Sequence, residues 1–119
     1  MPRYMISFEK GAMDHIPEED IPQVGKAAHA AVQEAKDAGV LRFAGGMSYD
    51  DGDVEHAVVG TDGLVTDGPY PESKELIGGA VIVDVPTRAE ALAWAAKIAA
   101  ACRCAQDVRK FMDDPELVD

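Results

Sequence analysis

The 119-residue sequence contains a histidine, His29, that is suited to moving a proton. Histidine titrates near neutral pH and acts as an acid or a base when a carboxylate orients its ring. This is the minimum equipment for isomerisation, lyase or dehalogenation chemistry. The alternative is a hydrogen-bonded histidine at the boundary of the core, without a catalytic role. Both interpretations stay open.

A second group of charged side chains lies between positions 67 and 75. The group consists of Asp67, Glu72, Lys74 and Glu75. If this segment borders a pocket, these side chains could serve as an acid, as a base and as charged groups that hold a ligand. The segment can equally be architecture, because aspartate before Gly-Pro bonds the backbone of its own turn. Glu72 and Lys74 can also pair with a neighbouring chain. Ligand contact and structure are therefore the two interpretations.

Metal and cofactor chemistry have little support in the sequence. Cys102 and Cys104 are too close for an ordinary disulfide and are interpreted as reduced structural thiols. Asp50, Asp51 and Asp53 lack the ordered ligand spacing of a calcium loop. The two Gly-Gly pairs lack the spacing of a phosphate-binding loop. We therefore predict neither a metal nor a cofactor.

A predicted helix over residues 21–38 positions His29. Apolar residues recur there at the spacing of one helix face, at Ile21, Val24, Ala28, Val32 and Ala35. His29 falls about a third of a turn from this stripe. It is therefore expected at the edge of the buried face, beside a cleft. Gly39 suits the left-handed residue that ends a helix.

The remaining patterns predict strands over residues 4–8, 40–47, 54–60, 64–66, 77–85 and 105–112, and a second helix over 88–101. Asp62-Gly63 predicts a tight hairpin turn. Thr87 followed by Glu90 is a capping box, after which Leu92, Ala95, Ala96, Ala99 and Cys102 repeat at helical spacing. This order predicts an α+β fold, a ferredoxin-like βαββαβ unit with an additional strand or hairpin and an antiparallel sheet.

Both faces of the predicted sheet carry apolar residues. In the strand over 77–85, Val81, Val83 and Val85 point one way and Ala80 and Ile82 the other. Two helices cover one face, so the other face needs a second cover. The sheet of a second subunit is the simplest one, and a homodimer that pairs sheet to sheet is predicted.

The length and the net charge of the chain limit the classes of protein to which it can belong. A chain of this size is expected to form one domain, over residues 1–112, followed by an acidic tail over 113–119. The net charge of -11 opposes approach to nucleic acid and to anionic lipid. No apolar run is long enough to cross a bilayer, and residues 1–8 do not resemble a secretion signal. We therefore expect a cytoplasmic protein without a nucleic-acid or membrane partner.

One motif resembles a known family. Residues 65–75 read Val-Thr-Asp-Gly-Pro-Tyr-Pro-Glu-Ser-Lys-Glu and are followed by Gly78-Gly79. This stretch is similar to the signature of the DGPF branch of the YCII-related family, which usually has Phe at position 70, Ala at 71 and Thr at 73. The segments Ala91-Leu92-Ala93-Trp94-Ala95 and Asp107-Val108-Arg109 also fall in the family's order.

The resemblance implies a dimeric α/β barrel and places His29 at the family's histidine. That histidine is proposed to act with an aspartate near the end of the first strand, where this chain has Glu9. The catalytic candidates are therefore His29 with Glu9 or Asp67, and the ligand-binding candidates are Glu72, Lys74 and Arg109.

Two functions follow as hypotheses. One is a small-molecule acid/base enzyme of isomerase or lyase type that works without a cofactor. The other is a non-catalytic ligand-binding or regulatory module, since the DGPF branch is often encoded beside alternative sigma factors. The first requires an open cleft lined by His29, and the second a cleft whose charged residues are tied up in structural pairs.

Overall fold

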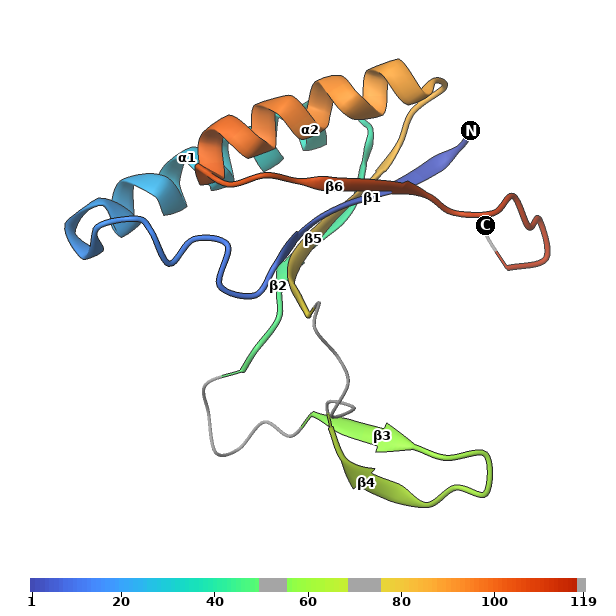
Figure 1. Ribbon diagram of the computed structural model, residues 1–119. Coiled ribbons are helices and arrows are strands. Elements are labelled where there is room, and N and C mark those ends of the chain that lie inside the picture. The colour runs from blue at the N-terminus through green and yellow to red at the C-terminus, as the bar shows by residue number, and fades with distance from the viewer. Residues whose placement is uncertain (50–55, 69–75, 118–119) are drawn as a thin grey trace.

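The fold is α+β, with two helices on one face of a four-stranded antiparallel sheet and a separate hairpin (Figure 1). The computed structural model describes residues 1–49, 56–68 and 76–117. The elements are β1 (Arg3–Glu9), the short 3-10 turn Glu18–Asp20, α1 (Ile21–Asp37), β2 (Leu41–Gly46), β3 (Ala57–Val59), β4 (Val65–Asp67), β5 (Ile77–Asp84), α2 (Arg88–Cys102) and β6 (Asp107–Lys110).

The four-stranded sheet has the order β2-β5-β1-β6. Alternation along β1 and β5 divides it into two faces. The inner face carries Tyr4, Ile6, Val81 and Val83, which are buried, and Val83 pairs with Tyr4 across the strands. The outer face carries Met5, Ala80 and Ile82, which are half-buried. The division predicted for the residues of the strand over 77–85 is confirmed.

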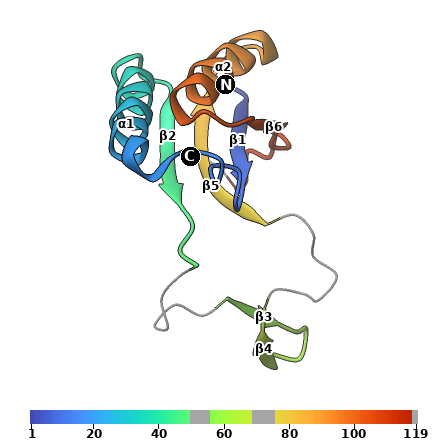
Figure 2. The same ribbon diagram turned by 60° about the vertical axis from the view of Figure 1, so that its left-hand side comes forward.

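Both helices pack against the inner face (Figure 2). α1 contributes Ala31 to the core, with Ala28 and Val32 packed against it, and α2 contributes a row of small and branched side chains, Ala91, Ala95, Ile98 and Cys102. Leu92 is 38% exposed and Ala96 is exposed, so the predicted inward face of α2 was partly wrong. Apolar residues surround α2 on all sides, so periodicity could not select its buried face.

The ends of the helices follow the sequence signals. The side chain of Thr87 accepts a hydrogen bond from the backbone N–H of Glu90 at 3.2 Å. At the end of α1, Gly39 has φ +76°, and the N–H groups of Gly39 and Val40 bond the carbonyls of Lys36 and Ala35. This is a Schellman motif, which satisfies the last carbonyls of the helix.

β3 and β4 pair only with each other in the described residues and form a hairpin that stands apart from the main sheet in both views (Figures 1 and 2). Its turn is held by Asp62, whose carboxylate accepts from the N–H of Leu64 at 2.9 Å, and Gly63 has φ +84°. The radius of gyration is 16.0 Å, whereas a compact domain of this length has about 13.5 Å. The predicted additional hairpin is therefore present as an arm.

No helix in the described ranges is both long and apolar enough to cross a membrane. The predicted acidic turn with Asp50, Asp51 and Asp53 lies outside the described residues.

Candidate functional site

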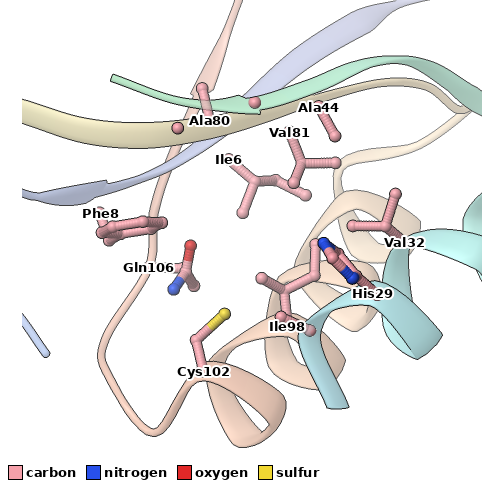
Figure 3. A pocket seen from close by; sticks show the side chains of 13 residues that line it. Ile6, Phe8, His29, Val32, Ala44, Ala80, Val81, Ile98, Cys102 and Gln106 are labelled. Carbon is pink, nitrogen blue, oxygen red and sulfur yellow. The ribbon is translucent and has the colours of Figure 1, made fainter. Parts of the chain in front are cut away.

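A pocket of about 290 Å³ lies between the inner face of the sheet and the two helices (Figure 3). Most of the residues that line it are apolar: Ile6, Phe8, Ala28, Val32, Ala44, Val81 and Ile98, beside the strand residues Gly45, Gly46 and Ala80. Three polar side chains complete the lining, those of His29, Cys102 and Gln106. An apolar pocket with a few polar groups is the usual form of a small-molecule site.

His29 reaches the pocket from α1. Its neighbours Ala28 and Val32 pack against the core, whereas His29 itself is exposed. The histidine therefore lies at the edge of the buried face, where the helical spacing placed it, with one side toward the cavity and one toward solvent. Its role as an acid or a base stays a prediction.

Cys102 and Gln106 come from the end of α2 and the turn that follows it. Arg103 adopts the left-handed conformation there, with φ 57°, which lets the chain reverse toward β6. The Gln106 amide nitrogen donates to the Cys104 carbonyl at 3.3 Å. Burial raises the pKa of the Cys102 thiol, and the neighbouring Cys104 raises it further. Cys102 is therefore a neutral thiol at neutral pH and not an activated nucleophile.

Phe8 forms one wall of the pocket from β1. Its ring packs against Gly78 and Gly79 so closely that a Cβ on Gly79 would lie 2.8 Å from a ring carbon. Gly78-Gly79 thus provides the close approach that a glycine pair in a strand indicates. The position of the ring depends on the absence of side chains at these two residues.

Glu9 does not line the pocket that holds His29. It lines a neighbouring hollow of about 640 Å³, together with His15, Arg103 and Asp107. Phe8 and Gln106 line both spaces and form the partition between them. The strand pairing of β1 shifts between Phe8 and Glu9, and such a bulge re-aims the next side chain. The structure brings Glu9 close to the pocket's wall but not into contact with the cavity.

The other candidates lie farther from His29. Asp67 is exposed on β4 of the hairpin. Arg109 is exposed on β6, and its guanidinium donates to the Asp107 carboxylate at 2.6 Å. Glu72, Lys74 and Glu75 lie outside the described residues. Their roles, like those of Asp67 and Arg109, stay predictions.

In the ranges that the structure describes, no three His, Cys, Asp or Glu side chains lie close enough together to hold a metal ion. Chemistry at the pocket would therefore use His29, Cys102 and Gln106 among the described side chains. Of these three residue types, histidine is the one that most often serves as a general acid or base in enzymes.

Sequence reasoning found His29 but missed Phe8 and Gln106 as pocket residues. Phe8 had a signal, because it faces inward on the first strand and the Gly78-Gly79 pair indicated a close approach. Gln106 had none, because the left-handed turn at Arg103 places it and Arg is rarely found in that conformation.

The fold and the pocket define a small α+β domain with a ligand-sized cavity between sheet and helices. The sequence matches the YCII-related domain over residues 5–110, and the chain belongs to this family. A comparison with curated proteins gives no match.

Proposed function

We propose that this protein is a cofactor-independent enzyme that performs acid/base chemistry of isomerase or lyase type on a small molecule in the His29 pocket. The observation that carries the proposal is the position of His29, a residue type that commonly serves as a general acid or base, on the wall of an otherwise apolar cavity. The chain's membership of the YCII-related family supports the proposal through the sequence resemblance, which places His29 at the family's histidine.

In the proposed reaction, His29 removes a proton from one carbon of the substrate and the same imidazole returns it to another. The step needs no oxidant or metal, because the proton is conserved. Glu9 is the preferred carboxylate to assist, since Phe8 and Gln106 line both its hollow and the pocket. Asp67 is the second candidate, from the hairpin.

We also propose that the domain is ferredoxin-like and pairs with a second copy, sheet to sheet, as a dimeric α/β barrel. The strand order β2-β5-β1-β6 supports the first part. The second part rests on the outer face, where Phe43 is 60% exposed beside half-buried Met5 and Ile82. Both helices lie on the inner face, so the outer face depends on another cover.

The test of the enzymatic proposal is proton exchange at carbon. Small cyclic enones and lactones are incubated with the protein in D₂O, and the loss of their α-proton signals is followed by NMR. His29→Ala is expected to lower the exchange rate by roughly 100-fold or more, the usual contribution of a general base. His15→Ala is the matched control, since His15 lines only the neighbouring hollow. Equal rates in wild type and His29→Ala would contradict the proposal.

The second candidate function is a ligand-binding or regulatory module. It is favoured by one observation, that no carboxylate among the described residues lines the pocket with His29. A protein that binds a ligand in this pocket but exchanges no protons in the D₂O assay would act in this way.

A further inference from the structure

We propose that the ligand of the His29 pocket is an uncharged, mostly apolar molecule of one or two rings that carries a single hydrogen-bonding group. This inference rests on the proposed function, in that it takes the His29 pocket as the working site. It adds the class of ligand, which follows from the charge, size and polar groups of the cavity.

The side chains that line the cavity disfavour an ionised ligand. Among the described residues, no Lys, Arg, Asp or Glu lines this cavity. A charge buried without a partner costs several kcal/mol, so either sign is disfavoured. An anion is disfavoured a second time by the protein's net charge of -11. The neighbouring hollow differs, since Glu9, Arg103 and Asp107 line it.

The volume limits the size of the ligand. A cavity of roughly 150 Å³ lined by apolar side chains takes up benzene, and this pocket has about 290 Å³. One or two fused rings therefore fit. Phe8 ends the cavity on one side, and its ring cannot retreat past Gly78 and Gly79 without losing that contact. Phe8 is thus the residue that sets the length of the ligand.

The polar side chains that line the cavity determine which hydrogen-bonding group the ligand carries. Figure 3 shows His29 and Gln106 on different sides of the cavity, with Ile6 on the sheet side between them. The Gln106 amide nitrogen donates to the carbonyl and the sulfur of Cys104, at 3.3 and 3.5 Å. Its side-chain oxygen is therefore the group that accepts from a ligand, and the His29 ring can accept or donate. A hydroxyl group on a ring system can bond either of these two side chains.

The test uses three probes with the same ring system and different charge: 2-naphthol, 2-naphthoate and 2-naphthylmethylammonium. Binding to the full chain is measured by titration calorimetry at neutral pH. We expect 2-naphthol to bind at least about tenfold more tightly than either ion, because only the ions lose hydration without gaining a partner. Equal or tighter binding of an ion, or no saturable binding of 2-naphthol, would overturn the inference.

The location of binding is tested with a matched pair of variants on α1. Ala28→Leu fills the cavity and is expected to abolish 2-naphthol binding, whereas Ala30→Leu adds the same side chain at an exposed position that does not line the cavity. Wild-type methyl NMR gives a second readout that needs no variant. The Val32 and Ile98 methyl signals are expected to shift with 2-naphthol, and those of Val59 and Val65 on the hairpin are not. Shifts confined to the hairpin would overturn the inference.

Failure of this inference and failure of the proposed function give different results. Preferential 2-naphthol binding without His29-dependent proton exchange in D₂O would support the proposed ligand class and contradict the proposed enzymatic function. His29-dependent exchange together with preferential binding of a charged probe would support the proposed enzymatic function and contradict the proposed ligand class.

Discussion

Gly79 is the residue on which the position of Phe8, and so the shape of the pocket, depends. A Cβ added there would lie 2.8 Å from the Phe8 ring and 3.2 Å from the Gly45 carbonyl oxygen. Gly79→Ala therefore forces the ring or the β2 backbone to move. We expect it to lower the free energy of unfolding by about 1 to 3 kcal/mol, as overpacking does. Urea denaturation at neutral pH measures this change.

Gly25→Ala is the control for this substitution. Gly25 lies in α1, and an added Cβ would meet nothing within 4 Å. Alanine is the better helix former, so Gly25→Ala is expected to raise the free energy of unfolding by about 0.5 to 1 kcal/mol. Opposite signs for the two alanine substitutions are the expected result. A Gly79→Ala protein as stable as wild type would mean that Phe8 does not depend on the glycine pair.

Asp84 makes the stability of the protein depend on acid pH. Hydrogen bonds from Arg3, at 2.6 and 3.0 Å, are the main cause that lowers the pKa of Asp84, and Arg42 at 3.4 Å adds to it. A folded pKa below the ordinary value of 3.8 means that the stabilisation is complete above that pH and is lost as the pH falls through the lowered value. Asp84→Asn is expected to cost about 1 kcal/mol at neutral pH.

The check is urea denaturation of wild type and Asp84→Asn from neutral pH down to the acid limit of folding. The difference between the two proteins should stay constant down to about pH 4 and shrink below it. Asp107→Asn removes an equally short ion pair, that between Asp107 and Arg109. Both of these side chains are more than half exposed. This substitution is expected to have an effect close to zero, because exposed pairs contribute little. A difference that grows in acid would rule out the assigned role of Asp84.

At the scale of elements, much of the fold was predictable from local patterns. The alternation in β5, the Thr87 cap and the Gly39 stop each depend on neighbours in the chain, and each is confirmed. The inward face of α2 was not predictable, because a helix that is apolar on all sides has no preferred face. The partition between the pocket and the Glu9 hollow was not predictable either, since a bulge in β1 and a left-handed turn at Arg103 create it.

The hairpin of β3 and β4 has few stabilising contacts with the rest of the described chain. Leu64 and Val65 are 64% and 62% exposed, and β3 and β4 pair only with each other in the described residues. A two-stranded hairpin by itself is marginally stable. Amides in β3 and β4 are therefore expected to exchange with solvent at least about 100-fold faster than those of β5. Hydrogen exchange followed by mass spectrometry at low protein concentration tests this.

Repeating the exchange at high concentration separates two causes of protection. Protection of the hairpin that increases with concentration would mean that a second copy covers Leu64 and Val65. Protection equal to that of β5 at every concentration would contradict the prediction, because it would require contacts within one chain.

At the scale of the whole molecule, the apolar residues on the outer face carry the argument for a second copy. Phe43, Ile82 and Phe111 line a hollow of about 540 Å³ on this face. Charged side chains border the same hollow, among them Arg3, Arg42 and Asp84. Phe43 and Phe111 are 60% and 43% exposed in the single chain. Exposed apolar side chains on one face of a sheet favour the proposed dimer. Pairing of two such faces would bury the patches on both chains at once.

Phe43→Glu is expected to dissociate the proposed dimer. Sheet-to-sheet pairing would bury position 43, and a carboxylate there would lose its hydration without a partner. We expect the dissociation constant of the dimer, measured by sedimentation equilibrium, to rise by roughly 100-fold or more. Leu92→Glu is the matched control, because Leu92 is exposed on α2, on the opposite side of the sheet. A monomeric wild type would contradict the proposed dimer. A dimer weakened only by Leu92→Glu would place the interface on the helical side and not on the outer face of the sheet.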